Sequence, residues 1–484
     1  MKIARTLLAG LASIPLVLAM AASAPAGTGT VQRDDGGEAP ALSDGFSRSV
    51  LATGLDNPFE VIYGPDDQLW VTERGAGRVT KIDPEDGTKT TILTIDESLS
   101  TPGEQDGLLG MALHPDLLKR GKNKNQYVYL SYTYAGDDET DALGRQQKIV
   151  RYTYDRRDET LENPFELLTA LPASDDHNSG RLAIAPDGTL HYTLGDRGNN
   201  QDLNACRPNL AQVLPTRGEV RDEDWFNYQG KSLRMELDGD IPKDNPRING
   251  VRSHVYTYGH RNAQGLVFAD DGNLYSSEQG PKSDDEINEL VAGGNYGWPN
   301  VAGFKDDSAY VFGDWSAAEG CGDEVPYDAF VIPDAVPQFA EHEFRMDMVQ
   351  PLRTYYTVPD THDFQGDACE PSGLFFICYP TIAPSNLDFY GDDEIPGWED
   401  SLLMTTLKTG AVFRVELTDD GELDESQQLW NSVNRYRDTA INEDGKTIYV
   451  ATDKDGLARG TNGDATTELE DPGAILVFTH EDDD

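Results

Sequence analysis

The chain has few cationic residues for its length. Its 484 residues contain 39 Lys and Arg against 86 Asp and Glu, a formal net charge of −47 at pH 7. Nucleic-acid binding depends on basic side chains that neutralise phosphates, so nucleic acid is excluded as a partner. The acids recur in pairs such as Asp66-Asp67 and Asp392-Asp393, which predicts a solvated acidic surface rather than one acidic tail. Such a surface suits a saline habitat, where counterions screen its self-repulsion.

Long apolar runs are missing after the first twenty residues. The start carries Lys2 and Arg5, an apolar run from Leu7 to Met20, and small residues up to Ala26. This is the build of a secretory signal peptide; a retained membrane anchor is the alternative. No later segment has the roughly 20 apolar residues that span a bilayer. We therefore predict a signal peptide at 1–26, a flexible linker at 27–44 and a periplasmic or secreted domain at 45–484 without a transmembrane segment.

Cysteine is scarce, and familiar enzyme motifs are absent. The sequence contains no GxSxG elbow, P-loop or Rossmann fingerprint. Its four cysteines are Cys206, Cys321, Cys369 and Cys378, and none has the CxxC or Cys/His spacing typical of zinc. An even number in an exported chain favours disulfides. Three pairings are open, and the short loop between Cys369 and Cys378 makes that pair the preferred bridge.

Helical periodicity is almost absent, and one β unit recurs instead. The unit is an apolar run, a turn rich in Pro, Asp and Gly, and a second apolar or aromatic run. It occurs six times, starting at Val61, Met111, Leu182, Leu266, Leu387 and Ala440. Several units are followed by another alternating strand, such as Arg78 to Ile82. The pattern predicts an all-β fold, a six-bladed β-propeller of four-stranded antiparallel blades. Two β-sandwiches are the alternative.

The repeats are unequally spaced, so long insertions lie between strands. The main ones run from Asn199 to Gln229 and from Asp306 to Pro384. In a propeller such insertions gather on one face and build the active site. Alternatively, they only make contacts in an oligomer.

The stretch from Gly259 to Asn300 is too polar for a simple hairpin. It flanks the hairpin sequence LVFADDGNLYSS with GHRN and EQGPKSDDE. Gly272 can adopt the positive φ of a tight turn, so the polar flanks should leave the sheet at its strand ends. The resulting site candidates are Arg261, Asn262, Gly280, Pro281 and residues 284–286.

Basic residues next to strand ends are informative in so acidic a chain. Arg261, Lys408, Arg435 and Arg437 each adjoin one of the repeated hairpins. If those strand ends meet, they form a cationic pocket for a compact polyanion, because Arg binds carboxylates through paired hydrogen bonds. Ordinary salt bridges between blades are the alternative.

A histidine among carboxylates stands directly before the third hairpin, in DDHNSGRL. His177 can act as a general base near neutral pH if a carboxylate such as Asp196 orients it. A structural histidine is the alternative. EQGPKSDDE offers hard oxygen ligands but departs from the EF-hand loop, so calcium there would rely on backbone carbonyls and carboxylates.

Several long motifs occur in one order along the chain. They are DHNSGRL, LGDRGNNQ, GHRNAQGL, SEQGPKSDDEIN, GGNYGWPNVAG, LKTGAVFR and NRYRD. The set resembles the soluble quinoprotein glucose dehydrogenases, which use pyrroloquinoline quinone (PQQ), from about Leu51 to Phe478. The resemblance implies a six-bladed propeller, usually dimeric, that oxidises aldoses at C1 to lactones. Electrons would pass to an acceptor such as a cytochrome or quinone.

The resemblance also implies roles for single residues. His177 would take the proton of the anomeric hydroxyl while hydride passes from C1 to the quinone C5. Asp196 would orient that histidine, Asp176 would contact the sugar, and Arg261 would lie near the reacting carbonyl. The cofactor-pocket positions are Gln105, Gln201, Arg261, Asn262, Lys408, Arg435 and Arg437.

Two calcium sites follow from the same resemblance. The backbone carbonyls of Gly280 and Pro281 would hold the ion that polarises the quinone. A second, structural ion near the dimer contact would use Asp285, Glu286, Tyr296 and Asp306.

The chain departs from the family pattern in CEPSGLFFICY. The loop between its two cysteines is longer, Phe376 stands where Tyr is expected, and Tyr379 stands where Trp is expected. Together with Gln105, these aromatics would flank the cofactor and the sugar. The contacts to the sugar therefore differ from the family pattern, which puts a preference for glucose in doubt. Cys206 and Cys321 are additional and allow a second bridge.

Two other functions compete with sugar oxidation. A lactonase-type propeller hydrolase also uses calcium but needs no cationic pocket for a tricarboxylate. A non-catalytic propeller that binds sugars or proteins has no reason to pair His177 with Asp196.

Overall fold

The computed structural model of the protein describes residues 45–121, 124–138, 141, 143–366, 375–418, 421–461 and 463–481. These residues belong to one structural unit. The predicted signal peptide and linker, residues 1–44, lie outside the described residues. No helix in the described part of the chain is long and apolar enough to cross a membrane.

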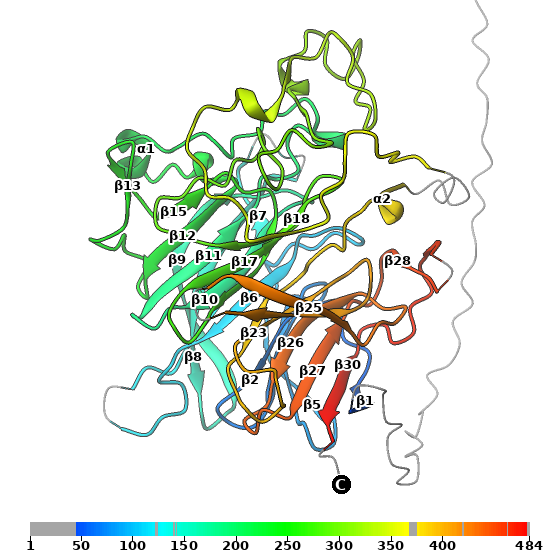
Figure 1. The fold of residues 1–484 in the computed structure, drawn as a ribbon. Coiled ribbons are helices and arrows are strands. Elements are labelled where there is room, and N and C mark those ends of the chain that lie inside the picture. The colour runs from blue at the N-terminus through cyan, green and yellow to red at the C-terminus, as the bar shows by residue number, and fades with distance from the viewer. Residues whose placement is uncertain are drawn as a thin grey trace, which may run out of the picture. The chain divides into compact units, whose positions relative to one another are not determined.

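Six four-stranded antiparallel sheets form a β-propeller (Figure 1). Blade 1 is β2 (Pro58–Tyr63), β3 (Leu69–Glu73), β4 (Arg78–Ile82) and β5 (Lys89–Thr94). Blade 2 is β6 (Leu108–Leu113), β7 (Tyr127–Ala135), β8 (Arg145–Asp155) and β9 (Thr160–Pro172). Blade 3 is β10 (Ser179–Ile184), β11 (Thr189–Leu194), β12 (Lys231–Glu236) and β15 (Val255–Tyr258).

The other three blades complete the ring. Blade 4 is β16 (Ala263–Phe268), β17 (Leu274–Glu278), β18 (Asp285–Glu289) and β21 (Arg353–Tyr355). Blade 5 is β22 (Asp388–Tyr390), β23 (Ser401–Thr405), β24 (Val412–Leu417) and β25 (Leu423–Leu429). Blade 6 is β26 (Tyr436–Ile441), β27 (Thr447–Thr452), β30 (Ile475–His480) and β1 (Phe46–Ala52). The predicted six-bladed fold is confirmed, and each repeated hairpin supplies the first two strands of one blade.

The remaining elements are short. Three two-stranded ribbons are β13 (Arg247–Ile248) with β14 (Val251–Arg252), β19 (Phe312–Gly313) with β20 (Gln338–Phe339), and β28 (Ala458–Arg459) with β29 (Ala465–Thr466). The helices are η1 (Asp202–Asn204), α1 (Arg217–Asp222), η2 (Phe226–Tyr228), η3 (Trp315–Ala317), η4 (Glu341–Glu343) and α2 (Phe375–Cys378).

Blade 6 closes the ring by joining both ends of the described chain. Strand β1 pairs antiparallel with β30, with Phe46 opposite His480 and Val50 opposite Leu476. The inner strands β2, β6, β10, β16, β22 and β26 contact one another in succession, and β26 returns to β2. Closure therefore depends on pairing between residues more than 400 positions apart.

A buried ion cluster, Arg181 with Glu60 and Asp438, lies among the inner strands. Nη1 of Arg181 is 2.8 Å from the Glu60 carboxylate and 3.3 Å from that of Asp438. Its other nitrogens donate to the carbonyls of Gln264, at 2.9 Å, and Ser385, at 3.0 Å. We call these three charged residues the central cluster. It links strands or strand ends of blades 1, 3, 4, 5 and 6.

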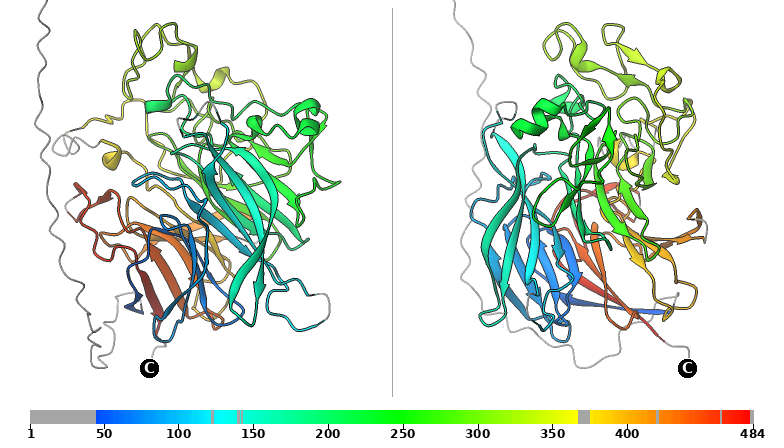
Figure 2. Two further views of the ribbon diagram at one scale, coloured as in Figure 1. Left: turned by 180° about the vertical axis from the view of Figure 1, so that it is seen from behind. Right: turned by 90° about the vertical axis from the view of Figure 1, so that its left-hand side faces the viewer.

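Two long loops stand at one end of the sheets, in the green and yellow-green parts of Figure 1 and again in Figure 2. The first joins β11 to β12 and holds η1, α1 and η2. The second joins β18 to β21 and holds η3 and η4. Strand β21 lies within the predicted insertion Asp306 to Pro384 and divides it. The sequence did not predict this strand, because three residues with one buried side chain show no recognisable alternation.

A disulfide fastens these two loops to each other. Cys206 of the first is bonded to Cys321 of the second, and Ala205, Trp315 and Val336 pack in the same apolar cluster. The second bridge allowed by the sequence is thus present. Of the preferred pair, Cys378 is disulfide-bonded, whereas Cys369 lies outside the described residues.

Replacing Arg181 tests the central cluster. Arg181→Met leaves the buried carboxylates of Glu60 and Asp438 without their cation, so we expect the free energy of unfolding to fall by about 3–5 kcal/mol. Urea unfolding measures this change. Arg157→Met is the matched control, since the side chain of Arg157 is 92% exposed.

A second variant keeps this test decisive if Arg181→Met does not fold. Adding Glu60→Gln and Asp438→Asn to Arg181→Met removes the uncompensated charges, and should restore part of the lost stability. Equal stability of Arg181→Met and the parent protein would contradict the role of the cluster.

Candidate active site

One cavity of about 1120 Å³ opens at the loop-bearing end of the propeller. Its walls come from the segments that precede inner strands and from the two long loops. The predicted residues that line it are Gln105, Asp176, His177, Gln201, Arg261, Gly280, Pro281, Asp285, Tyr379, Lys408, Arg435 and Arg437. The basic strand ends at Arg261, Lys408, Arg435 and Arg437 thus line the same cavity.

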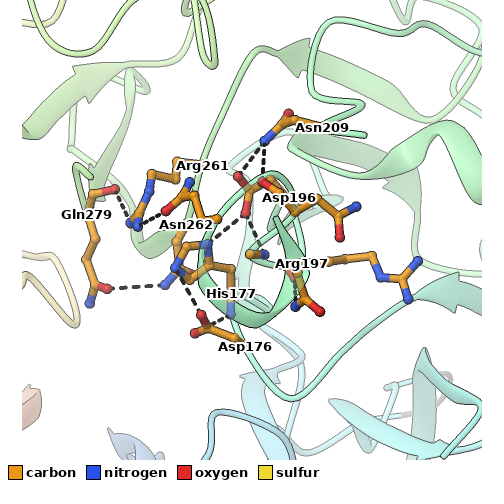
Figure 3. Close-up of polar contacts among 12 residues, drawn as sticks. Asp176, His177, Asp196, Arg197, Asn209, Arg261, Asn262 and Gln279 are labelled. Atoms are coloured by element: carbon orange, nitrogen blue, oxygen red, sulfur yellow. Dashed lines mark hydrogen bonds and ion pairs between the residues drawn. The ribbon is translucent and has the colours of Figure 1, made fainter. Parts of the chain in front are cut away.

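His177 is held between two carboxylates (Figure 3). Its Nδ1 lies 2.7 Å from Oδ1 of Asp196, and its Nε2 lies 3.5 Å from Oδ2 of Asp176. The residue has a φ of 47°, which turns the chain sharply before β10. Because Asp196 accepts the Nδ1 proton, Nε2 is left as the proton acceptor that faces the cavity.

Asp196 lies behind His177 and does not line the cavity. Its carboxylate accepts hydrogen bonds from Trp298 Nε1 at 2.7 Å, Asn209 Nδ2 at 2.8 Å and Gly198 N at 2.9 Å. Burial raises the pKa of Asp196, but His177, together with Arg261 and the Trp298 hydrogen bond, lowers the pKa below its ordinary value. Asp196 therefore stays ionised and can stabilise a protonated His177.

Asp176 is fixed by its neighbours. Its Oδ1 accepts hydrogen bonds from Gln105 and, at 2.9 Å, from the backbone N–H of His177. The side-chain oxygen of Gln105 accepts in turn from Asn262 at 3.2 Å and from Gln264 at 3.0 Å. Asn262 is fully buried and does not line the cavity, so it positions Gln105 rather than contacting a ligand.

Arg261 presents its guanidinium beside His177 (Figure 3). Nη2 donates to Gln201 at 2.8 Å, and Nη1 donates to the carbonyl of Gln279 at 3.1 Å. The guanidinium carbon is 5.6 Å from the centroid of the Trp298 ring. Among the described residues, no hydrogen-bond partner reaches the buried Nε of Arg261 or Nε2 of Gln201. Both are thus buried donors without a partner in the described chain.

A second cationic wall surrounds Asp453. Arg437 donates to both oxygens of this carboxylate, at 2.9 and 2.7 Å, and Arg435 donates to it at 3.0 Å. Burial raises the pKa of Asp453, but Arg437 and Arg435 lower it to about 2. Arg74, which also lines the cavity, was missed in the sequence, although it directly follows strand β3 and so stands at a strand end like the other basic residues. Arg435 and Arg437 share this one carboxylate, and the charge of Arg74 also acts on it, which leaves positive charge for an anion.

Lys408 and Asp285 border the same cavity. Lys408 donates to the carbonyl of Tyr379 at 2.8 Å, and burial lowers its pKa to about 7 despite the nearby Asp285. The carboxylate of Asp285 accepts backbone N–H groups of Gly280 at 2.8 Å and of Ile382 and Ala383 at 2.7 Å each. It thus ties the GPKSDDE loop to the segment before β22.

The predicted calcium ligands fall into two groups. Gly280 and Pro281 line the cavity, and among the described residues no hydrogen bond ends on their carbonyls. For the second ion, Asp285 is occupied as above, and the Tyr296 hydroxyl bonds the backbone of residues 289 and 291. Glu286 accepts from Gly303 N at 2.7 Å, and Asp306 accepts from Ser308 N at 2.8 Å. The described residues contain no group of three His, Cys, Asp or Glu that could hold a metal.

Aromatic side chains line the outer part of the cavity. Tyr379 lies edge-on to Phe330 and Phe364, with ring centroids 6.4 and 5.8 Å apart. Lys282 lies over the same two phenylalanine rings. Phe330 and Phe364 lie in irregular loops without a periodic pattern, so no sequence signal predicted them. Phe376 lies in α2, and its side chain is outside the described part of the chain.

Comparison with known proteins identifies the family. Residues 55–331 and 355–459 match the glucose/sorbosone dehydrogenase family. The chain belongs to that family. It is 44% identical over 449 residues to quinoprotein glucose dehydrogenase B of Acinetobacter calcoaceticus, covering 91% of this chain and 92% of the relative.

Two further matches are more distant in sequence. Aldose sugar dehydrogenase YliI of Escherichia coli K12 is 27% identical over 414 residues, covering 84% of this chain and 89% of its own. The PQQ-bound aldose sugar dehydrogenase of Streptomyces coelicolor superposes with a TM-score of 0.58 at 24% identity, covering 91% of this chain and 99% of that one. At that identity the superposition shows the propeller fold alone.

Asp453→Asn tests the cationic wall. The change leaves the buried Arg435 and Arg437 without an anion, and should lower the free energy of unfolding of the cofactor-free protein by about 3–5 kcal/mol at pH 7. The pKa of Asp453 is about 2 in the folded chain against an ordinary 3.8. The advantage of the parent protein is therefore complete above about pH 4 and is lost as the pH falls toward 2.

Urea unfolding of both proteins between pH 7 and pH 2.5 measures this. Asp424→Asn, on the exposed face of β25, is the control and should match the parent protein throughout. A stability difference that does not shrink at low pH would contradict the assignment to the ion pairs.

Proposed function

We propose that this protein is an exported, PQQ- and calcium-dependent dehydrogenase that oxidises the C1 hydroxyl of glucose-like aldoses to the lactone. The observation that carries the proposal is the His177–Asp196 pair, whose Nε2 faces a cavity walled by Arg261 on one side and by the Asp453 guanidiniums on another. A base and a strong anion site therefore share one space. The kinship with glucose dehydrogenases agrees with this arrangement.

The cavity suits a tricarboxylate such as PQQ. Its basic residues exceed what Asp453 and Asp285 neutralise, and the buried Nε atoms of Arg74 and Arg261 and Nε2 of Gln201 have no hydrogen-bond partner in the described chain. Burying such donors is costly unless a ligand bonds them. When bound, PQQ supplies the two-electron acceptor that sugar oxidation requires.

The protein's own residues manage the proton and the charge. Nε2 of His177 takes the proton of the C1 hydroxyl as general base. Asp196 holds the imidazole by Nδ1 and stabilises the imidazolium that forms. Asp176 accepts a hydrogen bond from a neighbouring sugar hydroxyl, and Arg261 favours negative charge that develops beside the reacting carbon.

Calcium is proposed at the carbonyls of Gly280 and Pro281, which line the cavity and accept no hydrogen bond in the described chain. Hard oxygen ligands of this kind suit calcium, which acts as a Lewis acid. The second ion, at Asp285, Glu286, Tyr296 and Asp306, stays a prediction. All four side chains bond backbone groups, which a bound ion would have to share or displace.

The surroundings of the enzyme are also proposals. Export rests on the signal-like residues 1–26, and adaptation to salt rests on the net charge of −47. A cytochrome or a quinone would take the electrons, and a homodimer is expected from the resemblance. A lactonase or a non-catalytic binding propeller has less support, since neither would need the base and the cationic walls together.

Reconstitution tests the proposal. The purified protein, loaded with PQQ and calcium, should reduce an electron-accepting dye when given an aldose, and His177→Asn should lower kcat by about 10²–10⁴-fold because the base is lost. His114→Asn is the matched control, since His114 lies at the other end of β6 from the cavity. If no aldose reduces the dye, the proposed function is wrong. If His177→Asn is as active as the control, the proposed role of His177 is wrong and the proposed function still stands.

A further inference from the structure

The carboxylate of Asp196 is bonded by four groups, and two of them are side chains that the proposed mechanism does not use. Its Oδ1 bonds Nδ1 of His177 and the backbone N–H of Gly198. Its Oδ2 accepts hydrogen bonds from Trp298 Nε1 at 2.7 Å and from Asn209 Nδ2 at 2.8 Å. Because Asp196 is fully buried, these donors rather than bulk water set how much negative charge His177 meets.

Trp298 is held by its surroundings with its N–H directed at Asp196. It is buried, and its ring packs on the ring of Tyr310, with centroids 5.9 Å apart. The hydroxyl of Tyr310 donates to the carbonyl of Pro299 at 2.6 Å, and burial raises the pKa of Tyr310, so this neighbour stays neutral. The guanidinium carbon of Arg261 lies 5.6 Å from the centroid of the indole. The same ring therefore supports Arg261 while its N–H bonds Asp196.

Asn209 approaches Asp196 from a different part of the chain (Figure 3). Its side-chain oxygen accepts the backbone N–H of Ala211 at 3.0 Å, which orients the amide so that Nδ2 bonds Asp196. Asn209 belongs to the loop between β11 and β12, whereas Trp298 belongs to the segment between β18 and β21. Both long loops thus contribute one donor to the carboxylate behind the base.

Most charges near His177 favour its protonated form. The charged groups around it are Asp176, Asp196, Asp202 and Arg261. Burial raises the pKa of Asp202, and Arg261 and His177 oppose that rise. Three carboxylates against one guanidinium stabilise the imidazolium, which cannot accept a proton. Hydrogen bonds onto Asp196 counter this effect, because they draw charge from the carboxylate while its bond to Nδ1 remains.

We propose that Trp298 and Asn209 are positioning residues that keep His177 unprotonated near neutral pH, because they hold Asp196 in place and draw charge from it. Both act through Asp196 and not on the substrate. Trp298 contributes a second time, since its ring supports Arg261, whose positive charge also opposes protonation of His177. The value of this role for catalysis rests on the proposed function, but protonation of His177 can be measured without turnover.

NMR of the cofactor-free protein labelled with ¹⁵N-histidine tests the inference. The imidazole nitrogens report protonation, and the signal of His177 among the eight histidines is the one that His177→Asn lacks. Trp298→Phe keeps an aromatic ring and removes the N–H, and Asn209→Ala removes the amide. In each variant we expect the midpoint of the His177 titration to rise by about half a pH unit or more, because a hydrogen bond to a charged group is lost. The double variant should show a larger rise.

Trp225→Phe is the matched control. Trp225 packs on Tyr228 and His254 and does not line the cavity, so its replacement should leave the midpoint of His177 unchanged. Asn209→Ala keeps the test decisive if Trp298→Phe does not fold, since both donors act on the same oxygen. No rise of the midpoint in the folded variants would overturn the inference. So would a parent protein in which His177 is still protonated at about pH 8.

The enzyme loaded with PQQ and calcium gives a second readout. In both variants the acid side of the pH profile of kcat should move to higher pH, whereas a merely structural role would lower kcat alike at every pH. KM for the aldose should change little in Asn209→Ala, because Asn209 does not line the cavity. A loaded parent protein that oxidises no aldose would count against the proposed function, and the NMR titration would still decide the roles of Trp298 and Asn209.

Discussion

The propeller depends on one buried guanidinium. Arg181 reaches the carboxylates of Glu60 and Asp438 and two backbone carbonyls, and Glu60 also accepts the backbone N–H of Met111 at 3.2 Å. Through these contacts all six blades meet one charge network. Burial raises the pKa of Glu60 to about 7, and Arg181 opposes that rise. A buried pair of this kind adds little net stability by itself, but it joins the inner strands of different blades at one point.

Pairing of buried charges also explains the active site. Most ionisable groups in the cavity are occupied by neighbours: Asp196 by Trp298 and Asn209, Asp285 by backbone N–H groups, and Asp453 by two arginines. What is left over defines the ligands. Unused guanidinium and amide donors belong to both cationic walls, at Arg74, Arg261 and Gln201. They give the cavity its capacity to bind an anion beside the base.

The sequence predicted the parts that local pattern controls. The six hairpins alternate apolar and polar residues around turns such as that at Gly272, whose φ is 88°, so the blade count could be read directly. Strand β21 is too short to show a pattern, and the partner of β1 lies at the far end of the chain. In the site, motifs located His177 and Asp196, but the burial of Asn262 and the bonds from Trp298 and Asn209 arise only from tertiary packing.

The disulfide between Cys206 and Cys321 makes the loops around the cavity depend on an oxidising environment. The blades can close around Arg181 in any redox environment, because strand pairing needs no oxidant. The loop that carries Gln201 and Asp202 is joined to the loop that carries Trp315 and Tyr327 only after two thiols are oxidised. A chain made in a reducing cytosol would thus have closed blades, but the two loops at the cavity would not be joined. Oxidation of these two thiols is therefore a step in building the entrance of the cavity.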